Sequence, residues 1–159
     1  TAIHKRNCFF DKWNKTILTP ISGLIEFHDA EGNWVASIDF GMLLMIGFFR
    51  GDERTQIERF VDRVISYRIF RDKNGKTNRS LIDAKGQLLI IPQFTLAAET
   101  SKGNRPSFSS ALEPQIAKLF FREFVQRVQT KLSVEVGVFG AHMEIHSVND
   151  GPCSFILTE

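Results

Sequence analysis

The chain has 159 residues, of which 43% are hydrophobic and 24% are charged, as is ordinary for a globular protein. Its formal net charge of +2 permits a nucleic-acid partner but is too small to establish one. Two cysteines exclude a disulfide framework and lack the spacing of a zinc site, so we expect a cytoplasmic location. No stretch is apolar for long enough to span a membrane. We therefore expect a single domain over residues 1–159 that has no membrane partner.

Strands and one helix are expected in the first half of the chain. Residues 1–40 predict two or three short strands, two of them joined as a hairpin around the turn-forming residues 29–33. Residues 40–49 are almost continuously apolar, which is typical of a central strand covered on both faces. Apolar residues at helical spacing between Ile57 and Ile65 then predict an amphipathic helix, for which Asp52 offers an N-cap oxygen.

The second half predicts a buried strand at 87–93, a long polar loop at 98–114 and a helix that begins at Pro114. The helix is expected to run to about residue 131 along an apolar stripe of Ile116, Leu119, Phe120, Phe124 and Val128. Three more strands are expected near 134–139, 142–148 and 153–157. Two helices among many strands predict an α/β fold, with helices on one face of a mixed sheet and a second sheet on the other.

Two short segments, 92–96 and 149–154, border predicted strands and carry groups suited to binding rather than packing. Because both border strands, they could lie side by side. The Gly151-Pro152 peptide is the most informative feature. An X-Pro bond takes the cis form at modest cost, and a glycine before it accepts backbone angles that a side chain would forbid. Such a turn can aim backbone carbonyls at a ligand.

The side chains of these segments offer little conventional catalytic machinery. Thr95 is a candidate nucleophile, but a hydroxyl is weak without a base, so a β-branched residue at a strand end is the slightly favoured interpretation. His142, Glu144 and His146 alternate along a predicted strand. Same-face neighbours on a strand are roughly 7 Å apart, which is awkward for one ion, so we expect a solvated face and no metal. No cofactor motif occurs either.

Basic residues gather in two polar segments of the chain. They are Arg71, Lys73, Lys76, Arg79, Lys102 and Arg105, with Phe108 as an aromatic platform nearby in sequence. A phosphate-binding surface and a solvated charged face remain equally open interpretations.

From about Phe40 onward the chain resembles the D-aminoacyl-tRNA deacylases, also called D-tyrosyl-tRNA deacylases. The resemblance rests on the two segments above and on further motifs in the same order. These are Arg68-Ile69-Phe70, the run 102–109 beginning Lys102-Gly103-Asn104-Arg105, and Gly137-Val138-Phe139-Gly140-Ala141-His142-Met143. Ala2-Ile3-His4-Lys5-Arg6 looks like the first strand of the family.

The resemblance implies a three-layer α/β/β fold, a homodimer with cross-subunit active sites, and hydrolysis of the ester that joins a D-amino acid to the terminal adenosine of tRNA. A cis Gly151-Pro152 turn would enter the partner's pocket and present two carbonyl oxygens to the substrate amino group. An L side chain would then collide with the turn, whereas glycine would be admitted.

The resemblance also implies roles for individual residues. Gln93, Phe94 and Thr95 would form the catalytic wall, with substrate-binding positions at Arg6, Pro92, Phe139, Met143, Asn149, Gly151 and Pro152. Of these, Phe139 and Met143 would hold the adenine, and Arg6 would support the Gly-Pro turn. Lys102 and Arg105 would contact the tRNA. With no strong base among these side chains, backbone N–H groups near Phe94 and Thr95 are expected to stabilise the oxyanion, and the tRNA 2′-hydroxyl to position or activate water.

The sequence departs from the family at Pro92, where serine is usual, and at Ser154, where threonine is usual. Pro-Gln is associated with an animal paralogue that removes mischarged L-alanine through a trans Gly-Pro turn. Phe94, Arg6 and residues 97–100 look like the D-specific branch, which we favour. The other alternative is a dimer that binds nucleic acid without catalysis.

Overall fold

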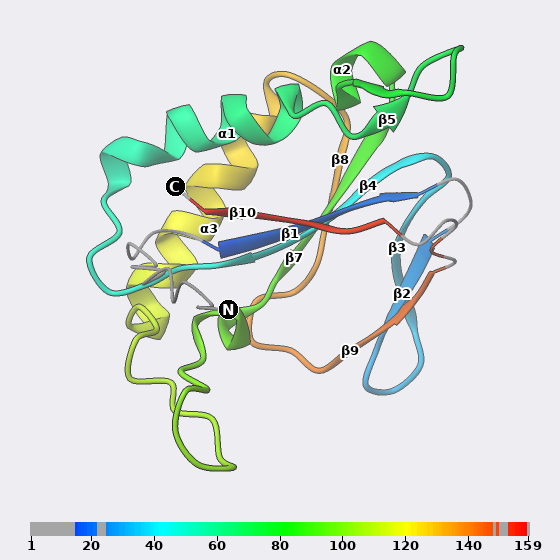
Figure 1. Ribbon diagram of the computed structural model, residues 1–159. Coiled ribbons are helices and arrows are strands. Elements are labelled where there is room, and N and C mark those ends of the chain that lie inside the picture. The colour runs from blue at the N-terminus through cyan, green and yellow to red at the C-terminus, as the bar shows by residue number, and fades with distance from the viewer. Residues whose placement is uncertain (1–14, 22–24, 148, 150–152, 159) are drawn as a thin grey trace, which may run out of the picture.

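The computed structural model describes residues 15–21, 25–147, 149 and 153–158. Its centre is a five-stranded mixed sheet of order β10-β1-β4-β7-β8 (Figure 1). The strands are β1 (Lys15–Ile21), β4 (Gly41–Gly47), β7 (Gln87–Pro92), β8 (Val134–Val136) and β10 (Phe155–Thr158). β1 runs antiparallel to β10 and β4, whereas β4, β7 and β8 are mutually parallel.

Helices cover one face of this sheet and a smaller sheet covers the other. The helices are α1 (Ile57–Ser66) and α3 (Pro114–Gln129), and the second sheet has the order β3-β2-β9, formed by Trp34–Ile38, Ile25–Asp29 and Met143–His146. Shorter elements are η1 (Arg54–Gln56), β5 (Phe70–Arg71), β6 (Thr77–Arg79), α2 (Leu81–Ala84) and η2 (Phe94–Ala97). This confirms the three-layer α/β/β prediction. None of the helices formed by the described residues is both long and apolar enough to cross a membrane.

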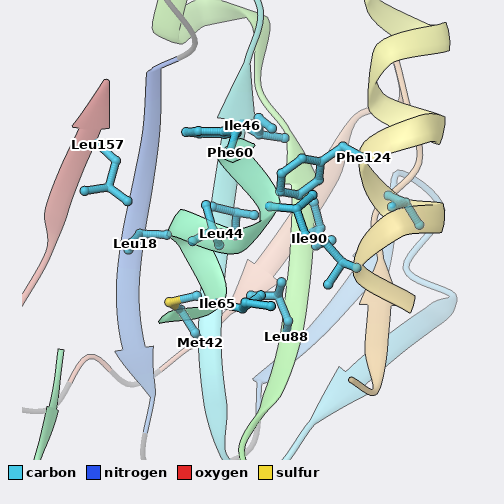
Figure 2. Packing of buried hydrophobic residues seen from close by; sticks show 14 of the residues in the cluster. Leu18, Met42, Leu44, Ile46, Phe60, Ile65, Leu88, Ile90, Phe124 and Leu157 are labelled. Atoms are coloured by element: carbon cyan, nitrogen blue, oxygen red, sulfur yellow. The ribbon is translucent and has the colours of Figure 1, made fainter. Parts of the chain in front are cut away.

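The larger core lies between the five-stranded sheet and the helices. Figure 2 shows Phe60 of α1 and Phe124 of α3 over the side chains of β4 and β7, and their ring centroids are 5.7 Å apart. On the other face, Leu43 and Leu89 pack with Ile38 of the second sheet. Successive strand residues alternate between faces, so both faces of β4 and β7 are buried. The prediction of a buried central strand at 40–49 is confirmed.

The start of the first helix differs from the prediction. Asp52 is buried, and its carboxylate accepts a hydrogen bond from the Phe49 N–H at 2.7 Å instead of capping the helix. A reciprocal box formed by Glu53 and Gln56 begins the helical segment at η1. Asp52 therefore closes the turn that leaves β4.

α3 begins at Pro114 as predicted, and Phe124 and Val128 of the predicted stripe are buried, but the first part of the stripe is not. Ile116 and Leu119 are 40% and 62% exposed. The buried side chains are Ala117, Phe121, Phe124, Val125 and Val128. Apolar residues lie on both sides of the true stripe, so periodicity alone did not fix the rotation. Phe121, which contacts Phe139 with ring centroids 5.9 Å apart, occupies the inward position.

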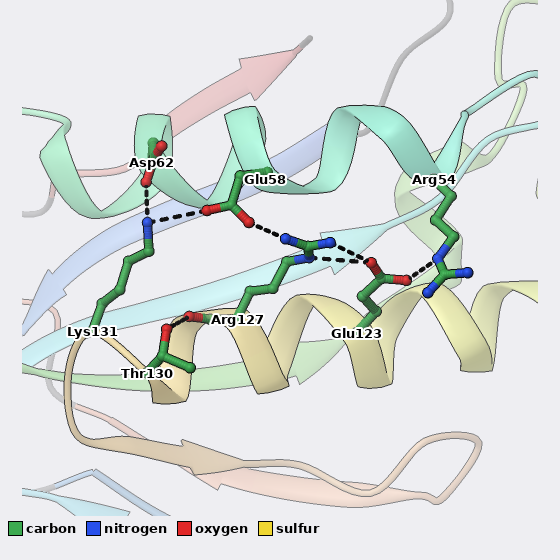
Figure 3. A network of polar contacts seen from close by, with 7 residues as sticks. All are labelled: Arg54, Glu58, Asp62, Glu123, Arg127, Thr130 and Lys131. Atoms are coloured by element: carbon green, nitrogen blue, oxygen red, sulfur yellow. Dashed lines mark hydrogen bonds and ion pairs between the residues drawn. The ribbon is translucent and has the colours of Figure 1, made fainter.

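A chain of ion pairs joins the outer surfaces of α1 and α3 (Figure 3). Its members are Arg54, Glu58, Asp62, Glu123, Arg127 and Lys131. A hydrogen bond from Arg127 lowers the pKa of Glu123, and one from Lys131 lowers the pKa of Glu58. A lowered folded-state pKa means that this stabilisation is present above the ordinary glutamate pKa and is lost as pH falls through the folded value. On this face, each cation of the network has an anionic partner.

Candidate active site

A cavity of about 820 Å³ opens where β4 and β7 end. The carboxyl ends of parallel strands are the usual place for ligand sites in α/β sheets. Its volume lies in the range of small-molecule and cofactor pockets. Residues of β4, η2, α3 and three loops line it, among them Ile46, Gly47, Phe48, Pro92, Gln93, Phe94, Phe108, Ile116 and Phe139.

A close backbone approach forms the floor of the cavity. The Gln93 N–H donates to the Ile46 carbonyl at 2.8 Å, which extends the β4–β7 ladder by one residue. A Cβ on Gly47 would lie 2.6 Å from the Gln93 carbonyl oxygen and 3.0 Å from the Leu96 Cβ. Glycine at this point lets the turn into η2 lie directly on the strand, and so places Gln93 and Phe94 at the cavity wall.

Of the three residues predicted to form a catalytic wall, Gln93 and Phe94 line the cavity and Thr95 does not. Phe94 is 57% exposed although it is a large aromatic residue, and its ring contacts Phe108 edge-on with centroids 5.1 Å apart. The Thr95 hydroxyl donates to the Gln93 Oε1 at 2.6 Å, and Thr95 does not line the cavity. An amide oxygen is a poor proton acceptor in catalysis, so this arrangement does not activate the hydroxyl.

Phe139 and Met143, predicted to hold a base together, occupy different environments. Phe139 lines the cavity. Met143 is the first residue of β9 and packs against the smaller core between the two sheets. Its sulfur accepts a hydrogen bond from the Val138 N–H at 3.4 Å. A Cβ on Gly137 would lie 3.2 Å from that sulfur. Met143 thus shapes the loop that presents Phe139.

Arg50 is a cavity residue that the sequence did not reveal. It lies three residues after the end of β4, and its Nε donates to the Ala111 carbonyl at 3.4 Å while its backbone N–H donates to the Ser110 carbonyl at 2.9 Å. These bonds tie the loop before α3 to the end of β4. The contact joins residues about sixty positions apart, so no local pattern pointed to it.

Lys102 and Arg105, the predicted tRNA contacts, lie at the exposed tip of the loop before α3. An antiparallel bridge between Glu99 and Ser107 closes this tip. Neither cation lines the cavity or forms an ion pair with another described residue.

Arg6, Gly151 and Pro152, the proposed gate and its support, lie outside the described residues. The structure describes residues on either side of this turn. Asn149 is exposed, and its side-chain oxygen accepts a hydrogen bond from the Cys153 N–H at 3.3 Å. Asn149 does not line the cavity.

The register of the sheet shows how far the second segment lies from the cavity of its own chain. The Ser154 hydroxyl is 3.0 Å from the Thr19 hydroxyl. Thr19 pairs with Leu43, and Leu43 pairs with Leu89 of β7. Across the sheet, Ser154 is therefore aligned with Leu89, which lies four residues before Gln93 along β7. Ser154 immediately precedes β10, and β10 is three strand spacings away from β7. These steps amount to roughly 20 Å. The expectation that the two segments lie side by side is wrong for these flanking residues within one chain.

The alternating His and Glu residues form no metal cluster. Glu144 and His146 are exposed on β9, and His142 precedes the strand. Within the described part of the chain, no group of three His, Cys, Asp or Glu residues is placed to hold an ion.

Comparisons with known proteins agree with this architecture. Residues 25–158 match the model of the D-Tyr-tRNA(Tyr) deacylase family. A Xanthomonas oryzae pv. oryzae protein named D-aminoacyl-tRNA deacylase is 49% identical over 125 residues, which cover 77% of this chain and 86% of that protein. An Alcanivorax borkumensis protein of the same name is 46% identical over 130 residues, covering 81% and 90%.

Solved structures give the same assignment at the level of the fold. A structure described as c-Myc DNA Unwinding Element Binding Protein superposes with a TM-score of 0.84 at 27% identity, covering 91% of this chain and 98% of that one. A probable eukaryotic D-amino acid tRNA deacylase superposes with a TM-score of 0.78 at 14% identity over the same shares, and shows the fold alone. The chain therefore belongs to the D-Tyr-tRNA(Tyr) deacylase family, and so to the hydrolases that act on ester bonds.

Proposed function

We propose that the protein hydrolyses the ester bond between a D-amino acid and the terminal adenosine of tRNA. The observation that carries the proposal is the apolar cavity walled by Gln93 and Phe94 at the ends of β4 and β7. Its size suits an aminoacylated nucleoside. Relatives of 46–49% identity are named for this activity.

Aromatic side chains supply the surface for the terminal base. Phe94, Phe108 and Phe139 all line the cavity, and the first two are exposed despite their size. Stacking of a base on an aromatic ring contributes about 1–3 kcal/mol and needs no sequence readout. Arg50 also lines the cavity, and its guanidinium would meet the phosphate of the terminal nucleotide.

The chemistry then depends on backbone groups rather than on a charged side chain. Water, oriented by the 2′-hydroxyl of the substrate, attacks the ester carbonyl carbon. The N–H groups of Phe94 and Thr95 open the η2 turn, where such groups have no partner inside their own helix, and they stabilise the oxyanion. Collapse of the tetrahedral intermediate breaks the bond to the adenosine oxygen, which leaves with a proton, and frees the amino acid.

The Gly151-Pro152 turn gates the pocket of a second copy of the chain. Two observations support a cross-subunit arrangement. First, Ser154, which lies two residues after the turn, is roughly 20 Å from the wall residues of its own chain. Second, Ile156 on the edge strand β10 is 68% exposed and pairs with Ile17, which leaves an apolar ridge on a sheet edge. A symmetric partner would cover this ridge.

Complementation between two inactive variants tests the cross-subunit gate. One variant carries Gly151→Val and Pro152→Ala, and the other carries Gly47→Val, whose side chain would displace the Gln93 carbonyl and the backbone that follows it. Co-expressed with different tags, they form mixed dimers in which one of the two sites is intact. We expect about a quarter of wild-type activity from a random mixture, and no activity from either variant alone. Purified mixed dimers without activity would contradict the gate.

Single-substrate assays test the stereochemistry. A backbone gate should release D-Tyr and Gly from tRNA and spare L-Tyr. Release of L-Ala would support the relaxed paralogue that the Pro92-Gln93 pair indicates. Salt-dependent tRNA binding with every ester intact would support a non-catalytic nucleic-acid-binding dimer, a role closer to the name of the DNA-element-binding relative.

A further inference from the structure

Positive charge is concentrated on the β5–β6 hairpin and the short helix that follows it. Residues 68–85 contain six cations and two carboxylates, a net charge of +4 against +2 for the whole chain. The cations are Arg68, Arg71, Lys73, Lys76, Arg79 and Lys85, and all six are exposed. We call residues 68–85 the basic hairpin.

Both carboxylates of the basic hairpin accept hydrogen bonds from nearby backbone N–H groups and polar side chains. Asp72 accepts hydrogen bonds from the N–H groups of Asn74 and Lys76 at 2.8 and 3.0 Å, and from the Asn78 amide at 3.2 Å. Asp83 accepts from the backbone and hydroxyl of Ser80 at 2.9 and 2.8 Å in a capping box. The two anions therefore stabilise turns instead of pairing with the cations.

Most of the cations remain available to an external partner. Arg68 and Arg79 bond to the carbonyl oxygens of Asn78 and Asp83. The other four, Arg71, Lys73, Lys76 and Lys85, form no ion pair with another described residue. The ion-pair chain between α1 and α3 is the opposite case, because Arg127 and Lys131 each bind carboxylates there.

The basic hairpin and the cavity lie at opposite ends of β7. α2 precedes β7 in the chain (Figure 1). The cavity lies at the other end of β7, where Pro92 and Gln93 line it. A strand of six residues spans roughly 20 Å. On one strand of a nucleic acid this corresponds to about six phosphate steps. If the last nucleotide of a ligand lies in the cavity, the basic hairpin can contact only phosphates several nucleotides away from that end.

We propose that the basic hairpin is a second nucleic-acid contact, which binds the phosphate backbone of the acceptor stem while the terminal adenosine occupies the cavity. The identity of the nucleic acid rests on the proposed function. The contact supplies affinity and orientation without reading sequence, because exposed lysine and arginine side chains bind phosphates as point charges or forks. It takes no part in the chemical step.

The test compares Lys73→Gln/Lys76→Gln with Lys118→Gln/Arg122→Gln, which removes the same charge from the exposed surface of α3. Binding of uncharged tRNA is measured across a salt series, together with single-turnover hydrolysis of D-Tyr-tRNA and of a D-tyrosyl-adenosine ester. We expect the hairpin variant to bind tRNA about tenfold more weakly at low salt. The slope of log K against log salt should become shallower by about 1.5, and the short ester should be cleaved at the wild-type rate.

The controls separate this inference from the proposed function. Equal weakening by both variants would reduce the effect to net charge and overturn the second contact. If the wild-type protein cleaves D-Tyr-tRNA but the hairpin variant binds tRNA as tightly as the wild type, the second contact is overturned and the proposed function stands. If the wild-type protein cleaves neither ester but the hairpin variant still loses tRNA affinity, the proposed function is overturned and the second contact stands. Both lysine side chains are exposed and take no part in the hydrogen bonds that Asp72 accepts in the turn, so the unfolding temperatures of the two variants should match that of the wild type.

Discussion

The two central strands, β4 and β7, begin and end in contrasting ways. At their amino ends the two backbones touch, since a Cβ on Gly41 would lie 1.8 Å from the Gln87 carbonyl oxygen. At their carboxyl ends the two backbones are still close at Gly47 and Gln93, but the residues beyond them line a cavity. The strands are thus in register at both ends, and only the carboxyl ends border a site.

The contrast explains why the wall of the cavity can be rigid without being tightly packed. Both strands are buried on both faces along their length, so their carboxyl ends have little freedom to move. Loops that carry function are commonly positioned by such a scaffold. Substitutions at the closed end should therefore change stability, and substitutions at the open end should change activity more than stability.

The largest effect is expected for Gly41→Ala at the closed end. The added Cβ would meet backbone atoms of Gln87, including its nitrogen at 2.6 Å, which no rotamer change can relieve. We expect the free energy of unfolding to fall by about 3 kcal/mol or more. Urea unfolding measures it. Gly32→Ala is the control, because its Cβ would meet nothing within 4 Å and only its φ of +81° is unfavourable. Equal losses in the two variants would show that the closed end is not tightly constrained.

Gly47→Ala, at the open end, is expected to reduce stability less than Gly41→Ala does and to reduce activity more. The Cβ would displace the Gln93 carbonyl and with it the start of η2. We expect a loss of about 1–3 kcal/mol in stability and a fall of at least about tenfold in kcat/KM for D-aminoacyl-tRNA. Activity is measured well below the unfolding temperature. If Gly47→Ala loses stability but keeps full activity, the expectation that substitutions at the open end mainly affect activity is wrong.

The sequence predicts the closed end better than the open one, for a physical reason. Continuous apolar runs identified β4 and β7, since burial on both faces leaves a strong local pattern. The inward face of α3 was predicted correctly at Phe124 and Val128 but not at Ile116, because apolar residues also flank the buried stripe. Phe121, which the prediction missed, contacts Phe139, a residue beyond the end of the helix in sequence.

The candidate site was predictable only in part. Gln93 and Phe94 were found because they end a strand and match a family motif. Arg50 was missed because its place depends on carbonyls of residues 110 and 111, and only the fold brings these segments together. The separation of Ser154 from the cavity was also missed, because strand order and register are set by long-range pairing that a single sequence does not display.

A moderate effect confined to activity is expected for Phe94→Ala. More than half of the side chain is exposed, so its removal should cost less than about 1 kcal/mol of stability. Loss of a base-stacking ring should raise KM about tenfold, whereas kcat should change little. Phe60→Ala, in the core, is the control and should destabilise by about 3–5 kcal/mol. A fall in kcat alone would indicate that Phe94 acts on the chemical step.

The smallest effect is expected for Thr95→Ala, which distinguishes backbone from side-chain catalysis at the open end. The hydroxyl donates to the neighbouring Gln93 amide oxygen and has no base beside it among the described residues, so its loss removes no nucleophile. We expect kcat/KM within about threefold of wild type and a stability change of about 0.5 kcal/mol or less, because the side chain is exposed. Single-turnover deacylation measures the first quantity. Thr95→Val, which keeps the shape but not the hydroxyl, should behave in the same way. If both variants lose activity as completely as a destroyed site, Thr95 is the nucleophile and the oxyanion model for Phe94 and Thr95 fails.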